Sequence, residues 1–154
     1  MSHDKGWIGV DLDGSLAIYD GWRNDGSIGA PIPKMVNRVK QWLKEGKNVK
    51  IMTARVYKNG ANEFPDQHKL QQGLIQEWCL KYIGQILPIT AEKDFHMYEL
   101  WDDRAVQLQP NTGTTMQEII AEKDEVITIL REALILEHRR AEDLEDELEP
   151  PGDF

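Results

Sequence analysis

The chain has 154 residues, 40% of them hydrophobic, and a formal net charge of −9 at pH 7. This length suits one domain with a sizeable core plus an appendage, and the acidic charge opposes the broad basic surface that non-specific nucleic-acid binding requires. The single cysteine, Cys79, cannot form an internal disulfide, and no apolar run is long enough to cross a membrane. We therefore expect a cytoplasmic protein with no membrane partner and no affinity for long nucleic acid.

The apolar segment from Trp7 to Asp11 predicts a short buried strand near the start of the chain. Residues 14–33 are rich in glycine, aspartate and proline, which predicts a small hairpin or flap. Apolar residues then recur on one helical face from Lys34. Pro33 suits the start of that helix, and Gly46 suits its end.

Strand and helix signals continue to alternate along the chain. Residues 48–53, NVKIMT, predict a second buried strand, and apolar positions from Leu70 to Tyr82 predict a second amphipathic helix. Three more segments predict a weak third strand, a fourth strand and an optional fifth: QILPIT at 85–90, YELWDD at 98–103 and AVQLQ at 105–109. This alternation indicates an α/β fold with a mainly parallel sheet and helices on both faces.

Polar residues end three of the predicted strands. Asp11 ends the first strand, Thr53 ends the second, and Asp102 with Asp103 ends the fourth. Because ligands in such folds bind beyond the carboxyl ends of the strands, we expect these side chains to meet at one edge of the sheet.

The acids predict a metal site at that edge. If the chain turns at Gly14, Asp11 and Asp13 can both enter one cleft with Asp102 and Asp103. Close carboxylates repel one another unless a cation lies between them, and oxygen ligands without a histidine or cysteine pair favour Mg²⁺. The sequence leaves open which of the last two acids binds the metal directly.

The same residues could perform nucleophilic catalysis on a phosphate. A carboxylate can attack phosphorus and form an aspartyl-phosphate that water later hydrolyses. Asp11 would be the nucleophile, Asp13 the general acid and base, and Thr53 the donor to the phosphate oxygens. Lys93 would hold nucleophile and phosphate, with two lysines in neighbouring segments as alternatives.

Three motifs resemble those of the haloacid dehalogenase superfamily. VDLDGSLA resembles its first motif, KIMTAR its second and LWDDRA its fourth. Lys93, nine residues before Asp102, stands where compact members carry the lysine of the third motif. The resemblance runs from Trp7 to Leu108, and the ordered set of motifs is more specific than any one of them.

This resemblance implies a Rossmann-like core, Mg²⁺ and phosphomonoester hydrolysis through an aspartyl-phosphate on Asp11. The second aspartate, Asp13, distinguishes the phosphatases and phosphomutases from the dehalogenases. The DDR ending is similar to that of small phage-encoded members and of polynucleotide kinase 3′-phosphatase domains. The intervals between motifs hold no cap domain, so an open site is implied. Such a site suits a nucleotide, a nucleic-acid end or another phosphomonoester, or a small substrate that an oligomeric neighbour covers.

Other residues near the motifs have two interpretations each. Arg55 and Arg104 could bind a second phosphate or a carboxylate of the substrate, or form structural ion pairs. Trp22 and Arg23 could stack on a base or sugar, or pack on their own hairpin. The loop within residues 56–69 could be a lid over the substrate or a long connection.

The last third of the chain predicts one long helix. Thr115 and Glu118 have the spacing of a capping box, and no glycine or proline follows until Pro150. Ten positions at alternating steps of 4 and 3 form a heptad seam in which eight are apolar: Met116, Ile120, Lys123, Ile127, Leu130, Leu134, Glu137, Ala141, Leu144 and Leu148. We interpret the helix as a coiled coil that forms a homo-oligomer. The alternative is a helix that folds back or frays beyond Arg140.

These patterns divide the chain into a catalytic domain over residues 1–113, an oligomerisation helix over 114–149 and a tail over 150–154. The leading hypothesis is an Mg²⁺-dependent phosphatase. A second is a non-catalytic phosphate-binding or scaffolding protein that uses the coiled coil. A third is a phosphotransferase or mutase, which normally needs a cap to exclude water.

Overall fold

The computed structural model describes residues 6–58 and 65–148. The chain divides into two compact units, residues 1–105 and 106–154. This division lies ahead of the boundary expected at residue 113 because the intervening segment bonds to the residues that follow it. The backbone N–H of Gln109 donates to Thr114 at 2.8 Å, and that of Met116 donates to Gln107 at 3.0 Å. The expected tail lies outside the described residues.

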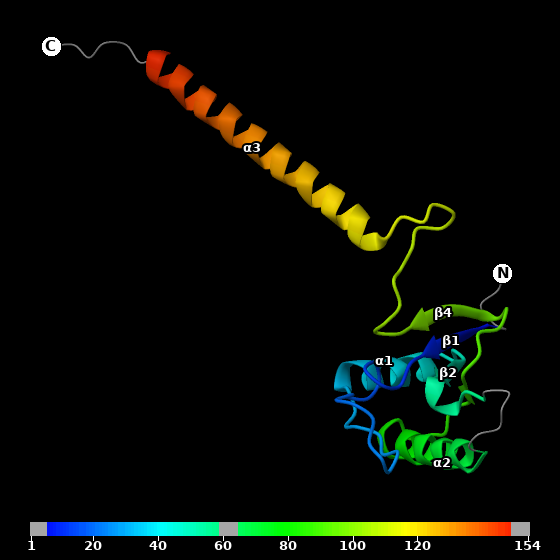
Figure 1. Cartoon of the computed structure of the whole chain (residues 1–154). Helices are drawn as coiled ribbons and strands as arrows, with labels where there is room; N and C mark the ends of the chain where they lie inside the picture. Colours follow the sequence, from blue (N-terminus) through cyan, green and yellow to red (C-terminus); the bar gives the residue numbers. More distant parts are fainter. Residues whose placement is uncertain (1–5, 59–64, 149–154) are drawn as a thin grey trace. The chain divides into compact units, whose positions relative to one another are not determined.

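The first unit contains a sheet of four parallel strands in the order β3-β2-β1-β4. Figure 1 labels β1, β2 and β4. The strands are β1 Trp7–Val10, β2 Val49–Met52, β3 Ile89–Thr90 and β4 Met97–Trp101. The chain winds from β1 through β2 to β3 on one side, and β4 lies on the other side of β1. The direction of winding therefore reverses between β1 and β4, and the expected Rossmann-like α/β fold is confirmed.

Two helices connect the first three strands. They are α1 Pro33–Lys44 and α2 Pro65–Tyr82, and a short 3-10 helix, η2 Ala54–Val56, precedes α2. Buried side chains of α1 and α2 share one core with Ile8 and Val10 and with the β2 residues paired to them. Because strand side chains alternate between faces, these strand residues lie on one face of the sheet. Both helices therefore pack on the same face.

The opposite face has no helix from residues 6–58 or 65–105, the described part of the first unit, although the sequence analysis expected helices on both faces. The reason is the connection from β3 to β4, residues 91–96, which is too short to contain one. On the covered face, the rings of Trp42 and Trp101 lie 5.2 Å apart between centroids and join α1 to β4. Cys79 is buried in this core, and burial raises the pKa of its thiol to about 11. This cysteine therefore fills core space, as expected.

The segment between β1 and α1 forms the expected flap. The backbone N–H of Ile18 donates to Ala30 at 2.8 Å, and that of Ile32 donates to Leu16 at 2.7 Å. The optional fifth strand at 105–109 is wrong, because its only ladder contact is an isolated antiparallel bridge between Leu108 and Thr115. That bridge belongs to the second unit.

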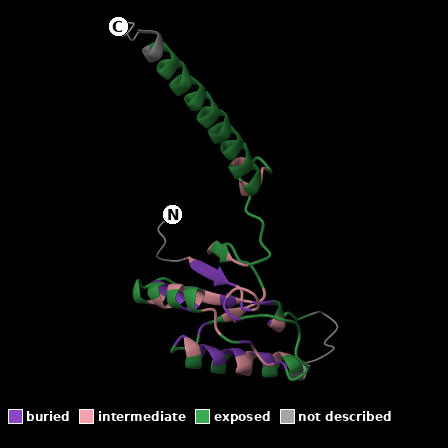
Figure 2. Ribbon diagram, turned by 90° about the vertical axis from the view of Figure 1, so that its left-hand side faces the viewer, coloured by how far each residue is buried: buried purple, intermediate pink, exposed green. Residues whose placement is uncertain are grey.

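The second unit consists mainly of α3, Met116–Leu148, which begins with the expected capping box. The backbone N–H of Thr115 donates to Glu118 Oε2 at 2.7 Å, and that of Glu118 donates back to Thr115 Oγ1 at 3.1 Å. Figure 2 shows exposed residues along nearly the whole of α3, whereas α1 and α2 each have buried positions. No helix among the described residues combines the length and the apolar character needed to cross a membrane.

Candidate functional site

A cleft of about 570 Å³ lies at the carboxyl ends of the strands. Its lining brings together six polar residues that the sequence analysis singled out: Asp11, Asp13, Thr53, Arg55, Asp102 and Arg104. They follow β1, β2 and β4, so the sheet places three separate sequence motifs in one cleft, at the point where the winding reverses.

Three carboxylates cluster at this edge. Oxygen atoms of Asp11, Asp102 and Asp103 all lie within 4.8 Å of one another. Burial is the main cause that raises the pKa of Asp11 from its ordinary value of 3.8 to about 7, and the negative charge of Asp102 is the second. A hydrogen bond from the backbone N–H of Leu12 lowers the pKa and offsets part of this rise. A cation among these oxygens would relieve the repulsion, and a set made only of carboxylate oxygens fits Mg²⁺.

The residues after Asp13 fix the position of this cluster. Gly14 has a φ of 95°, and a Cβ at this position would lie 2.7 Å from Asp103 Oδ2. Ser15 Oγ accepts a hydrogen bond from the backbone N–H of Asp103 at 3.0 Å. Gly14 therefore leaves room for Asp103 of the fourth motif and Ser15 bonds to it, a role that the sequence analysis did not assign to Ser15.

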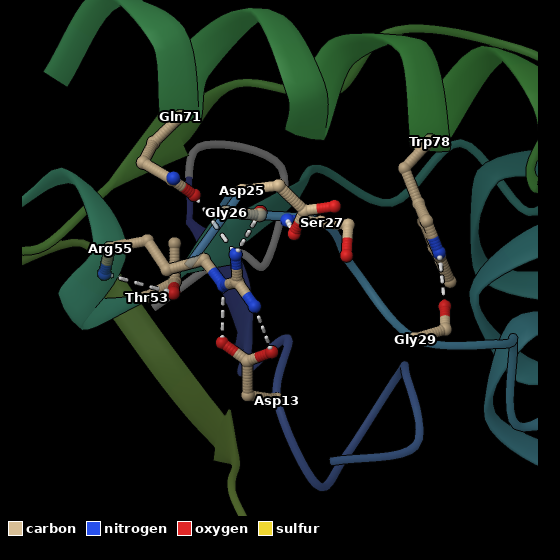
Figure 3. Close-up of polar contacts among 9 residues, drawn as sticks. All are labelled: Asp13, Asp25, Gly26, Ser27, Gly29, Thr53, Arg55, Gln71 and Trp78. Carbon is tan, nitrogen blue, oxygen red and sulfur yellow. Dashed lines mark hydrogen bonds and ion pairs between the residues drawn. The ribbon is translucent and has the colours of Figure 1, made fainter. Parts of the chain in front are cut away.

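The Asp13 carboxylate forms an ion pair with Arg55 (Figure 3) and is not part of the cluster of three. Arg55 Nε donates to Asp13 Oδ2 at 2.5 Å, and Arg55 Nη2 donates to Oδ1 at 2.8 Å. The Arg55 side chain is only 4% exposed. Of the four acids expected to share a metal, the structure therefore clusters three, and both oxygens of the fourth are occupied by an ion pair.

Arg55 also joins two other parts of the first unit, the flap and α2, as Figure 3 shows. Its Nη1 donates to the carbonyl of Gly26 in the flap at 2.8 Å and to Gln71 Oε1 of α2 at 2.9 Å. Gln71 is 2% exposed, and sequence reasoning missed it. The available signal was a polar residue four positions before Ile75, on the buried face of a predicted helix.

Thr53 lies in the cleft, whereas Lys93 is not among its lining residues. Thr53 is 3% exposed, and its Oγ1 accepts a hydrogen bond from the backbone N–H of Arg55 at 3.3 Å. Its hydroxyl proton remains available to a ligand oxygen. Lys93 is exposed, two residues beyond Ala91, which does line the cleft.

No family model and no curated protein matches the chain. One solved structure, described as that of a conserved protein coded by a locus from Bacteroides thetaiotaomicron, is similar with a TM-score of 0.43. The two are 20% identical, over 76% of this chain and 89% of that chain. A likeness of this degree identifies neither a family nor an activity.

The raised pKa of Asp11 predicts that metal-free protein loses stability as the pH rises. The folded chain holds a proton on Asp11 up to a pKa of about 7, whereas the unfolded chain loses it near 3.8. The contribution of Asp11 to the free energy of unfolding therefore falls as the pH rises from 3.8 to about 7, and it stays low at higher pH. After a discount for solvent screening, Asp11→Asn should stabilise metal-free protein by about 1–2 kcal/mol at pH 8. Urea unfolding of both proteins at pH 4 and pH 8 in chelator measures the difference.

The same unfolding measurements repeated with Mg²⁺ test the metal site. Mg²⁺ should stabilise the wild type at pH 8 more than Asp11→Asn, because the variant lacks one carboxylate of the cluster. The prediction fails if the difference in free energy of unfolding between the metal-free wild type and metal-free Asp11→Asn is the same at pH 4 and at pH 8.

The buried pair between Asp13 and Arg55 predicts a large loss of stability on its disruption. Arg55→Ala leaves a carboxylate that is largely shielded from solvent without its partner and should lower the free energy of unfolding by about 3 kcal/mol. Arg23→Ala is the matched control, because Arg23 pairs with Asp20 at 3.2 Å on the exposed surface of the flap. Its loss should cost about 0–1 kcal/mol. Equal effects of the two substitutions in chemical denaturation would overturn this interpretation.

Proposed function

We propose that the chain is an Mg²⁺-dependent phosphomonoester hydrolase of the haloacid dehalogenase type, with Asp11 as the nucleophile. The observation that carries the proposal is the position of Asp11, which follows the central strand β1 and clusters with two acids that follow β4. The three sequence motifs support the same chemistry. Asp11 and Asp102 both line the cleft, so these two are the proposed direct metal ligands, while Asp103 is held by Ser15.

In the first step, an Oδ of Asp11 attacks phosphorus, so that a new P–O bond forms as the ester P–O bond breaks. Asp13 gives a proton to the leaving oxygen, and the Thr53 hydroxyl donates to a phosphoryl oxygen. In the second step, water attacks phosphorus, Asp13 takes its proton, and the bond to Asp11 breaks. When bound, Mg²⁺ would neutralise phosphate charge beside the carboxylates. The products are an alcohol and inorganic phosphate.

Asp13 needs two protonation states in this cycle, and its pair with Arg55 bears on both. As a carboxylate held by Arg55, it can accept the proton of the attacking water. To serve the first step, it must carry a proton, which weakens its attraction to the guanidinium. Because Arg55 bonds to both carboxylate oxygens of Asp13, it acts as a positioning residue for Asp13.

Phosphate release from a panel of phosphomonoesters tests this function directly. Asp11→Asn should lower kcat by roughly a thousandfold or more, because it removes the nucleophile. Glu77→Gln, an exposed acid of α2, is the control and should leave kcat unchanged. Removal of Mg²⁺ with chelator should also abolish turnover. Metal-independent release, or equal rates for Asp11→Asn and the wild type, would refute the proposal.

We also propose that α3 associates with α3 of other copies of this chain. Apolar seam residues of α3 are 44–68% exposed in the single chain: Ile120, Ile127, Leu130, Leu134 and Leu144. Isolated helices gain little stability without a packed apolar face, so burial of this seam would supply the missing interaction. Lys123 and Glu137, the two polar seam residues, would restrict the register of the assembly.

A single substitution on the seam tests this association. Leu134→Asp places a charge at the interface and should convert the oligomer to a monomer in multi-angle light scattering. Thr128→Asp adds the same charge on α3 away from the seam and should leave the oligomer intact. A wild-type chain that is monomeric at concentrations of about 100 μM would contradict the proposal.

A further inference from the structure

Exposed aromatic side chains gather at the acidic cleft. Among the described residues, the exposed aromatic ones are Tyr19 at 39%, Trp22 at 52%, Tyr57 at 66% and Phe95 at 83%. The first three line the cleft that contains Asp11. We call these three residues the aromatic wall. Exposed apolar surface collected at one site indicates an interaction surface, whereas isolated exposed side chains need no explanation.

The Trp22 ring of the aromatic wall packs against the guanidinium of Arg55. The Arg55 guanidinium carbon lies 5.0 Å from the centroid of the Trp22 ring. Arg55 is itself fixed by its bonds to Asp13, Gly26 and Gln71. The indole therefore lies against a buried, hydrogen-bonded cation while half of the side chain faces solvent. A surface that is already ordered loses little entropy when a flat group stacks on it.

We propose that the aromatic wall binds the base of a nucleoside monophosphate whose phosphate reaches Asp11. This assignment rests on the proposed function, because that function places the phosphate. A purine or pyrimidine supplies the flat π-system that stacks on tryptophan and tyrosine without sequence preference. The cleft volume of about 570 Å³ lies within the range of sites for small ligands.

The charge around the cleft favours a free nucleotide over a nucleic-acid strand. Two cationic side chains line the cleft, and Arg55 is occupied by Asp13. Within the described part of the chain, the guanidinium of Arg104 forms no ion pair, so one cation is left for the ligand. A strand needs a track of cations along its phosphates, and the chain as a whole carries a charge of −9.

The test compares a nucleoside 5′-monophosphate with ribose 5-phosphate, which has the same phosphate and sugar but no base. The wild type should have a kcat/KM at least tenfold higher for the nucleotide. Trp22→Ala and Tyr57→Ala should each lower this preference roughly tenfold, mainly through KM, because stacking on each base is lost. Trp22→Phe should retain most of the preference. Phe95→Ala removes an exposed aromatic residue outside the cleft and should leave both substrates unaffected.

Several outcomes would overturn the base subsite while leaving the hydrolase intact. These are equal kcat/KM for both substrates in the wild type, an equal loss for both in the alanine variants, or a preference for a phosphotyrosine peptide or a 5′-phosphorylated oligonucleotide. If no substrate is hydrolysed, calorimetric titration with the nucleotide in Mg²⁺ decides. Binding that Trp22→Ala weakens about tenfold would keep the subsite and reject the hydrolase, and no binding would reject the subsite.

Discussion

The repulsion among carboxylates at one edge of a small sheet is the constraint on which this structure depends. Asp11, Asp102 and Asp103 come from strands far apart in sequence, yet their oxygens lie within 4.8 Å of one another. Burial and mutual charge raise the pKa of Asp11 to about 7, so the metal-free site is electrostatically unfavourable near neutral pH. A cation bound among these oxygens would relieve the repulsion, which is the chemistry that the proposed function requires.

Arg55 connects the other parts of the site to one another. Its guanidinium bonds to the first motif at Asp13, to the flap at Gly26 and to α2 at Gln71, and it stacks on Trp22. The buried guanidinium of Arg55 therefore fixes the position of Asp13, the proposed general acid, and the position of Gly26 in the flap. Because these contacts share one side chain, changes in the flap and changes in Asp13 should be energetically coupled.

Short apolar runs followed by acids were enough to predict the strands and the edge where Asp11, Thr53 and Asp102 meet, because parallel strands share their carboxyl edge. The bond between Asp13 and Arg55 could not be predicted, since the chain has 27 acids and 18 bases and pairing depends on three-dimensional proximity. Helices on both faces were expected from strand and helix alternation alone. The connection between β3 and β4 is too short for a helix, so the second helical layer is missing. The segment AVQLQ forms an isolated bridge through Leu108 and does not join the sheet.

The small size of the first unit also bears on how the proposed hydrolase would distinguish its substrates, since the rim of the cleft is the surface beside the proposed phosphate site. The interval between β1 and α1 holds a flap, and the described part of the interval between β2 and α2 holds η2, so neither contributes a separate covering domain there. A substrate that is not enclosed can gain affinity only from groups beside the phosphate site. In this chain the exposed groups at that position are aromatic and not cationic, with Arg104 as the exception. Under the proposed function, the rim would therefore favour a flat apolar group attached to the phosphate over additional negative charge.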